Sequence, residues 1–212
     1  MPSPPIGRRR SSATSWTSVA SSSGTQSSGW GGADVRIVAG EAKGRRLHAP
    51  PEGTRPMTGR AKESVFSILG DRVVGASVLD LYAGSGSLGL EALSRGASNA
   101  VFVERSARAA AVLRRNIDAV GLGGSVVVAD AARALRGLDG VYDIVFVDPP
   151  YDEVDGRVAT TLAVLDHVLD PHGIVIVHRR AGGGAVGPEF LTSVDERRYG
   201  DAVVTMFERT EP

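Results

Sequence analysis

The sequence contains no cysteine, and this absence excludes several kinds of protein chemistry at once. A chain of 212 residues without cysteine has no disulfide, no cysteine-ligated zinc or iron–sulfur cluster and no thiolate nucleophile. The lack of disulfides fits a reducing cytosol, so we expect a cytoplasmic protein. The sequence also has no apolar run of about 18 residues, so we expect no membrane-spanning segment.

Net charge is absent as well, but the charges are unevenly distributed along the chain. The 24 basic and 24 acidic side chains cancel overall. Residues 35–62 have seven basic side chains against two acidic ones, whereas residues 63–212 have 14 basic against 21 acidic ones. A basic segment in front of an acidic body predicts a polyanionic partner bound at one end of the molecule. The alternative is that the basic stretch is only solvated surface.

Hydrophobic periodicity is absent from residues 1–34, which are rich in Ser, Gly, Pro and Arg. Such a composition cannot bury enough apolar surface to form a core, so we predict a disordered tail. Its Arg- and Ser-rich, acid-poor character is also typical of an organellar transit peptide. Against this, 22 of the 24 basic residues are Arg, which suggests GC-rich bacterial coding. A third interpretation is that translation starts at Val35 and that the tail is a gene-calling artefact.

The segment 35–57 is expected to form a basic β-hairpin and an extended connection. Two strand-like runs, 36–39 and 45–48, flank turn-forming glycines. The connection contains Pro50, Pro51, Gly53 and Pro56. Residues 58–212 are then expected to form the larger domain. It begins with a helix that starts at Thr58 and ends near Gly70, because apolar residues recur there at three- and four-residue spacing.

Apolar runs alternate with helical segments from residue 77 onward. The runs are continuous and rich in β-branched residues, as in strands buried on both faces. They cover residues 78–81, 100–103, 126–128, 144–147 and 174–177. The helical segments lie near residues 87–95, 106–120, 130–136 and 157–169. This alternation predicts an α/β fold with a doubly wound, mostly parallel sheet and right-handed crossovers, and residues 197–199 and 202–207 predict a closing hairpin.

The ends of these strands are where a ligand is expected. An open parallel sheet binds ligands beyond the carboxyl ends of its strands, where the strand order reverses. The first apolar run ends near Asp80 and leads into a glycine-rich turn that contains Ala83, Gly84 and Gly86. Glycine lets the backbone approach a ligand that a Cβ would block, although a tight structural turn has the same sequence.

Further carboxylates follow the next three runs, at Glu104, Asp130 and Asp148. Glu104 lies 24 residues after Asp80, close to the offset of about 20 residues at which an acid binds ribose hydroxyls. Asp130 also suits a helix N-cap. A dinucleotide site directs a pyrophosphate at the helix N-terminus, where acids are unfavourable, whereas these carboxylates suit a cation. S-adenosylmethionine, which has an ammonium and a sulfonium group, is the cofactor we expect.

The most specific motif is Asp148-Pro149-Pro150-Tyr151, directly after the fourth run. Two prolines fix the backbone and remove two N–H donors, so the Asp148 carboxylate and nearby carbonyls form a rigid set of acceptors. Acceptors beside an aromatic ring are what a flipped base with an exocyclic amine requires. The motif resembles that of S-adenosylmethionine-dependent methyltransferases that modify exocyclic base amines. A proline-rich turn is the alternative.

Several more motifs, in their order, resemble the bacterial 16S rRNA guanine-N2 methyltransferase family of RsmD type. They are RIVAG at 36–40, GRRL at 44–47, the residues around Thr58, the stretch 78–97, and YGD at 199–201. The resemblance implies a Rossmann-like class I methyltransferase fold, in which a small hairpin and a helix precede a seven-stranded sheet with an antiparallel last strand. It also implies methylation of the N2 amine of guanine 966 in 16S rRNA.

The resemblance implies a cofactor-binding set and a catalytic set. The cofactor-binding set is Thr58, Asp80, Ala83, Gly84, Gly86, Glu104 and Asp130. Within it, Glu104 would hold the ribose hydroxyls and Asp130 the adenine amine. The catalytic set is Asp148, Pro149, Pro150 and Tyr151. Here Asp148 and the Pro149 carbonyl would accept the hydrogens of the target amine, and Tyr151 would stack on the base.

The expected partner is 16S rRNA or the small ribosomal subunit, bound by a monomer that needs no metal. DNA amine methyltransferases usually have a sizeable target-recognition domain, for which this chain is too short. The residues expected to bind RNA phosphates are Arg36, Lys43, Arg45, Arg46 and Arg60. The four histidines show no metal-ligand spacing, and methylation of a pyrimidine C5 is excluded because it needs a thiolate. Alternatives are an adenine-N6 or other base-amine methyltransferase, and a non-catalytic RNA-binding module on a relic methyltransferase fold.

Overall fold

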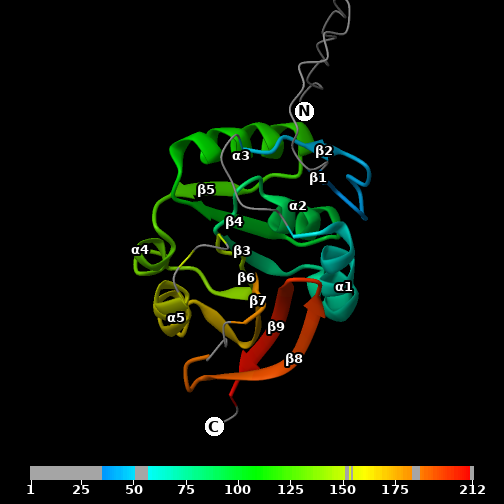
Figure 1. Ribbon diagram of the computed structural model, residues 1–212. Helices are drawn as coiled ribbons and strands as arrows, with labels where there is room; N and C mark the ends of the chain where they lie inside the picture. The colour runs from blue at the N-terminus through cyan, green and yellow to red at the C-terminus, as the bar shows by residue number, and fades with distance from the viewer. Residues whose placement is uncertain (1–34, 51–56, 151–152, 154, 183–186, 211–212) are drawn as a thin grey trace, which may run out of the picture. The chain divides into compact units, whose positions relative to one another are not determined.

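A seven-stranded sheet forms the centre of the computed structural model (Figure 1). Its strands are β3 (Ser77–Leu81), β4 (Asn99–Glu104), β5 (Ser125–Val128), β6 (Tyr142–Val147), β7 (Leu169–Arg180), β8 (Leu191–Tyr199) and β9 (Ala202–Arg209). Their order across the sheet is β5-β4-β3-β6-β7-β9-β8. Strand β9 runs antiparallel to both neighbours, and the other pairs are parallel. The predicted doubly wound, mostly parallel sheet with an antiparallel last strand is confirmed.

The structure describes residues 35–50, 57–150, 153, 155–182 and 187–210. The predicted tail at 1–34, most of the predicted extended connection, and Tyr151 therefore lie outside the described residues. Among the helices that are described, none combines the length and the apolar character needed to cross a membrane.

The helices are α1 (Gly59–Leu69), the short 3-10 helix η1 (Gly70–Val73), α2 (Ser87–Ser94), α3 (Ala107–Val120), α4 (Ala131–Leu135) and α5 (Asp155–Ala163). Side chains cap three of them, as the sequence favours. The Thr58 hydroxyl accepts from the backbone N–H of Ala61, and the Ser106 hydroxyl accepts from that of Ala109. Helix α1 ends at Gly70, which has a positive φ of 51°.

The predicted helix at 157–169 is wrong in its second half, because α5 ends at Ala163. Val164 and Leu165 donate to carbonyls only three residues earlier, which tightens the chain into turns before β7 begins. Leu165 and Val168 are buried in these turns. Their helix-like spacing in the sequence therefore reflects burial in a turn and not a continued helix.

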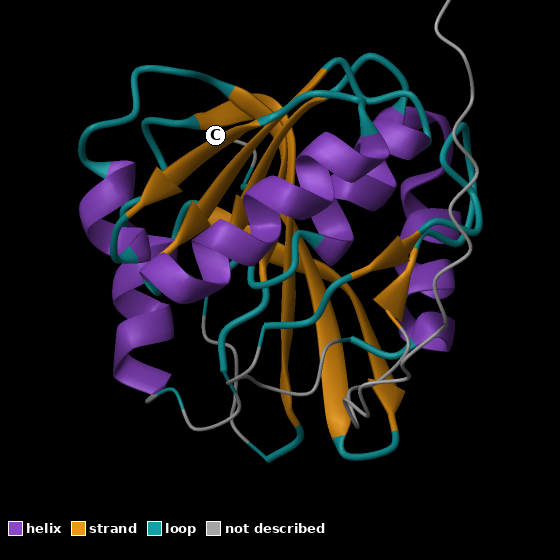
Figure 2. Cartoon of the chain, turned by 90° about the horizontal axis from the view of Figure 1, so that it is seen from above, coloured by secondary structure: helices purple, strands orange, loops and turns teal. Residues whose placement is uncertain are grey.

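Helices cover both faces of the sheet (Figures 1 and 2). Alternate residues of the central strands enter different apolar clusters. On β6, Ile144 and Phe146 pack with α1, α2 and α3, whereas Val145 and Val147 pack with α4 and α5. Because neither face of the central strands meets solvent, their sequences are continuously apolar.

The predicted basic hairpin is present, with strands shorter than the sequence runs. Strand β1 (Val35–Arg36) pairs antiparallel with β2 (Arg46–Leu47). The hairpin is held against α2, because the backbone N–H groups of Val38 and Ala39 donate to the two carboxylate oxygens of Glu91, at 2.7 and 2.9 Å. Gly40 lies so close to α2 that a Cβ there would meet the Ser94 carbonyl oxygen at 1.7 Å. The hairpin is thus part of the core on this face of the sheet.

Candidate active site

The strand order reverses between β3 and β6. These two strands are parallel neighbours, with Leu81 paired with Val147. From β3 the chain passes to β4 on one side, and from β6 it passes to β7 on the other. At such a point, where loops leave the carboxyl ends in opposite directions, doubly wound proteins bind their ligands. The glycine-rich turn follows β3, and the Asp148 motif follows β6.

Asp80 is the most buried of the acidic residues at the carboxyl ends of the strands. The residue is 1% exposed, and one carboxylate oxygen accepts from the backbone N–H of Gly89 at 2.9 Å. Burial raises the pKa of the Asp80 carboxyl well above its usual range. The Gly89 hydrogen bond opposes this rise, while the charges of Asp148 and Glu104 add to the pKa. A buried carboxyl with two further carboxylates close by favours a cationic ligand, which would offset the cost of its negative charge.

Glu104 connects the end of β4 to the glycine-rich turn. One carboxylate oxygen accepts from the Gly84 N–H at 2.9 Å, and the other accepts from the Ser106 N–H at 2.7 Å. A carboxylate oxygen can accept two hydrogen bonds. Glu104 therefore holds the turn in place and keeps acceptor capacity for a ligand hydroxyl.

The glycine-rich turn begins with a strained residue, since Tyr82 has a positive φ of 61°. Such strain in a residue other than glycine is concentrated at functional sites. Gly84 has a φ of 55°, and the nearest atom to a Cβ built there is 3.9 Å away. A Cβ at Gly86, in contrast, would lie 2.4 Å from Leu113. Gly84 therefore faces open space that a ligand could use, whereas Gly86 is required for packing against α3.

Asp130 and Thr58 have capping contacts in this structure. One Asp130 oxygen accepts from the Arg133 N–H at 3.3 Å, which caps α4, and the other lies 2.7 Å from the Arg157 guanidinium. The N-cap interpretation of Asp130 thus describes what the side chain does here. The Thr58 hydroxyl caps α1 through Ala61. The structure brings Asp80, Glu104 and Asp148 close enough for their charges to interact.

The Asp148 motif is anchored to both neighbouring strands. The Asp148 N–H donates to the Leu81 carbonyl at 3.5 Å, which continues the β3–β6 pairing. The Asp148 Oδ1 lies 2.7 Å from Nδ1 of His178, a residue of β7. A small pocket of about 200 Å³ adjoins Pro149 and Pro150 and extends to Arg179 and Arg180. The motif therefore borders a cavity large enough for a small chemical group.

The contact with His178 is missing from the sequence interpretation, which considered the histidines only as metal ligands. Within the described part of the chain, no three His, Asp or Glu side chains are arranged to hold a metal ion. A usable signal was present, because His178 directly follows the apolar run 174–177. The rule that selected Asp148 by its position at a strand end selects His178 as well.

The residues expected to bind RNA lie on the hairpin and the first turn of α1. All five side chains are exposed: Arg36, Lys43, Arg45, Arg46 and Arg60. The Arg45 guanidinium also donates to the Ala119 carbonyl at the end of α3. Arg45 therefore has a structural contact in addition to its charge.

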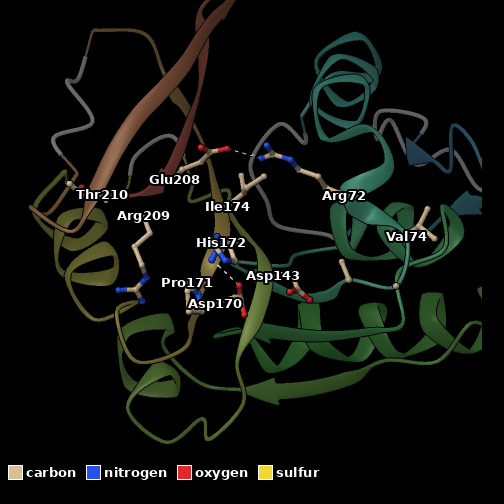
Figure 3. Close-up of a pocket in the computed structure, with 12 residues that line it drawn as sticks. Arg72, Val74, Asp143, Asp170, Pro171, His172, Ile174, Glu208, Arg209 and Thr210 are labelled. Atoms are coloured by element: carbon tan, nitrogen blue, oxygen red, sulfur yellow. Dashed lines mark hydrogen bonds and ion pairs between the residues drawn. The ribbon is translucent and has the colours of Figure 1, made fainter. Parts of the chain in front are cut away.

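A larger pocket, of about 740 Å³, lies at the opposite end of the strands, away from the carboxyl ends of β3 and β6 (Figure 3). It adjoins the amino end of β6 at Asp143, the start of β7 at Asp170, and the Arg72–Glu208 ion pair of 2.7 Å. No residue of the predicted site lines it. Size alone therefore does not identify the functional site, since the strand-end carboxylates are elsewhere.

Comparisons with known proteins agree with this geometry. The family described as Conserved hypothetical protein 95 matches residues 35–208. The protein YlbH of Bacillus subtilis is 36% identical over 148 residues, which are 67% of this chain and 80% of YlbH. The ribosomal RNA small subunit methyltransferase D of Haemophilus influenzae is 32% identical over 173 residues, 79% of this chain and 90% of the relative.

The structure of yhhF from Escherichia coli superposes with a TM-score of 0.74 at 32% identity, covering 84% of this chain and 98% of yhhF. The fold is that of the class I methyltransferases. Fold, strand-end carboxylates, motif and relatives agree, and the chain belongs to the RsmD family of ribosomal RNA methyltransferases.

Proposed function

We propose that this protein transfers a methyl group from S-adenosylmethionine to the exocyclic N2 amine of a guanine in small-subunit rRNA, which by family resemblance is guanine 966 of 16S rRNA. The observation that carries the proposal is the position of Asp148. Its motif leaves β6 where the strand order reverses, within interaction range of the buried Asp80 carboxyl. This position would put an acceptor for the target amine beside a site for a cationic cofactor.

The residues around the turn fit S-adenosylmethionine. The buried Asp80 favours the positive charge of the methionine part, and the open side of Gly84 leaves room for it. Glu104 retains acceptor capacity for the ribose hydroxyls, and Asp130 would accept from the adenine amine if Arg157 gave way. When bound, the cofactor supplies an electrophilic methyl carbon and a neutral thioether leaving group.

The chain's own contribution is to orient a weak nucleophile. The lone pair of the guanine N2 amine is delocalised into the ring. Hydrogen bonds from the amine to the Asp148 carboxylate and the Pro149 carbonyl would localise that lone pair and direct it. Pro149 and Pro150 have no N–H to donate, so their backbone offers the amine acceptors only. Correct orientation alone can supply about 7–11 kcal/mol of a barrier.

The basic hairpin is the proposed RNA-binding surface. Its exposed arginines and lysine would bind phosphates, which fixes the register of the RNA without reading its sequence. The choice of guanine would then depend on contacts to the flipped base around Asp148. The acceptor motif by itself suits any exocyclic base amine, so an adenine-N6 product is a distinct outcome of the test below.

Mass spectrometry of rRNA nucleosides tests the proposal. A strain that lacks the gene is complemented with the wild type, with Asp148→Ala or with an empty vector. We expect N2-methylguanosine at the small-subunit site only with the wild type. Its undiminished presence in the strain without the gene would refute the assignment, and restoration of N6-methyladenosine instead would change the target base. Calorimetry with S-adenosylhomocysteine separately tests the cofactor site.

A further inference from the structure

His178 and Asp148 occupy adjacent positions on one face of the sheet. Strands β6 and β7 are parallel neighbours in the sheet (Figure 1), with Val147 opposite Val177. Asp148 and His178 are the next residues along the chain, so they lie side by side. Residues two apart on a strand point to the same face. Phe146 and Ile176 both pack in the cluster with α1, α2 and α3. Asp148 and His178 therefore project toward that same face, at the carboxyl end of the sheet.

The two side chains make a short polar contact between a buried and a partly open group. Nδ1 of His178 lies 2.7 Å from Oδ1 of Asp148. The His178 side chain is 2% exposed, whereas that of Asp148 is 21% exposed. An ionised carboxylate can only accept hydrogen bonds, so Nδ1 must be the donor when Asp148 is charged. His178 thus contacts Asp148 from the buried side, while the Asp148 side chain stays partly exposed.

A carboxylate that must accept from one particular amine needs a fixed plane. Without a second contact, rotation about the last side-chain bond would sweep both oxygens of Asp148 through many orientations, because that torsion is broad. The hydrogen bond from His178 engages Oδ1 and thereby sets the direction of Oδ2. Pro149 fixes the backbone that follows. The chain thus constrains Asp148 from its backbone and from its side chain.

We propose that His178 is a positioning residue: Nδ1 donates to Oδ1 of Asp148 and orients the carboxylate so that Oδ2 accepts from the target base amine. The inference rests on the proposed function, because it takes Asp148 as the acceptor of that amine. A structural histidine that only satisfies a strand-end acid is the competing explanation. The two differ in what happens to turnover when the hydrogen bond is removed and then restored.

Two substitutions separate these explanations in the full-length protein. His178→Ala removes the donor, whereas His178→Asn keeps an amide N–H near the place of Nδ1 but cannot hold a second proton. Methyl transfer to small-subunit rRNA is measured together with calorimetric affinity for S-adenosylhomocysteine. Positioning errors of about 1 Å can cost about a hundredfold in rate. We expect His178→Ala to lower kcat about 10- to 100-fold, with KM for RNA and affinity for S-adenosylhomocysteine nearly unchanged.

His178→Asn is expected to recover most of that kcat, to within about fivefold of the wild type, as the hydrogen bond explanation requires. Nitrogen NMR of the imidazole gives a readout independent of turnover. It should show the proton on Nδ1 in the wild type and a changed tautomer balance in Asp148→Ala. His172→Ala is the matched control, because His172 is exposed near the amino end of β7, at the opposite end of the strands from His178. We expect it to leave kcat and affinity unchanged.

Three results would overturn the inference. They are a wild-type kcat in His178→Ala, a His178→Asn variant as slow as His178→Ala, and an imidazole with its proton on Nε2 only. Failure of the proposed function looks different, because the wild type itself would then methylate no guanine. If the wild type methylates another base amine, the same comparison of variants decides the role of His178.

Discussion

The Lys62 ammonium lies 3.1 Å from a carboxylate oxygen of Glu91, and both side chains are buried between helices α1 and α2. Lys62 also donates to the Arg36 carbonyl at 2.7 Å and to the Ser87 hydroxyl at 3.2 Å. Glu91 accepts from two backbone N–H groups of the hairpin. Burial lowers the pKa of Lys62, and the Glu91 charge opposes that shift. This ion pair therefore connects α1, α2 and the hairpin.

We expect Glu91→Leu to lower the free energy of unfolding by about 3–5 kcal/mol, because it leaves Lys62 as a buried charge without its partner. Urea unfolding followed by circular dichroism measures the loss. Adding Lys62→Met to Glu91→Leu should restore part of the stability, because the remaining buried charge is then removed. Losses that simply add in the double variant would show that the pair is not energetically coupled.

Asp80→Asn should make the protein more stable at neutral pH and less able to bind its cofactor. A carboxyl whose pKa is raised on folding binds more protons in the native state than in the unfolded state. Stability therefore falls as the pH rises from 3.8, the ordinary pKa of an aspartate, to the raised pKa of Asp80 in the folded protein. Above that raised pKa, stability stays at the lower level. Asn retains an acceptor for Gly89 but has no charge, so this fall should disappear.

The measurement is urea unfolding between about pH 4 and pH 8, with calorimetry of S-adenosylhomocysteine at neutral pH. We expect an affinity loss of about tenfold, or about 1.4 kcal/mol, for the lost contact with the ligand ammonium. Asp118→Asn, on the exposed side of α3, is the control and should change neither quantity. A stability profile for Asp80→Asn parallel to that of the wild type would show that Asp80 is not the titrating group.

Alanine substitutions at Gly84 and Gly86 should show which of these turn glycines is needed for packing and which for ligand binding. Gly86→Ala places a Cβ against Leu113 at a φ of 79°, so we expect a stability loss of about 2–4 kcal/mol. Gly84→Ala meets open space at a φ of 55°, so its cost should be only about 1–2 kcal/mol. We expect Gly84→Ala to weaken S-adenosylhomocysteine binding in calorimetry more than its stability loss explains. Unchanged binding would show that the open side of Gly84 is not used by the ligand.

Neutralising two exposed cations should weaken RNA binding without affecting the cofactor site. Lys43→Gln with Arg60→Gln is expected to lower affinity for small-subunit rRNA and to reduce the slope of log affinity against log salt by about 2, or about 1 for each lost phosphate contact. Arg45 is avoided because its guanidinium also contacts Ala119. Filter binding at several salt concentrations gives the slope.

The control for this pair is Arg133→Gln with Arg136→Gln, which removes the same charge from α4 and its C-cap on the other face. An equal loss of RNA affinity in the control would indicate a general charge effect and not specific RNA binding by the hairpin. Affinity for S-adenosylhomocysteine should be unchanged in both double variants.

Much of the fold follows from local patterns. The continuous apolar runs of β3, β4 and β6 predict buried parallel strands, because burial on both faces removes the need for polar side chains. The run at 126–128 predicts a buried strand as well, but β5 is the edge strand of the sheet and Val128 is exposed. Thr58 and Gly70 mark the two ends of α1 through their own capping preferences. The predicted helix at 157–169 fails because the spacing of Leu165 and Val168 records burial, and burial alone does not specify a helix.

The sequence by itself determined the sheet, the glycine-rich turn and the carboxylates at strand ends, because periodicity, capping and turn chemistry act over a few neighbouring residues. Only the tertiary structure decided which of these groups act on one another. It joined His178 to Asp148, 30 residues away, and Glu91 to the hairpin more than 50 residues away. The physical reason is that such contacts depend on strand order and on which face a side chain takes, and neither is encoded locally.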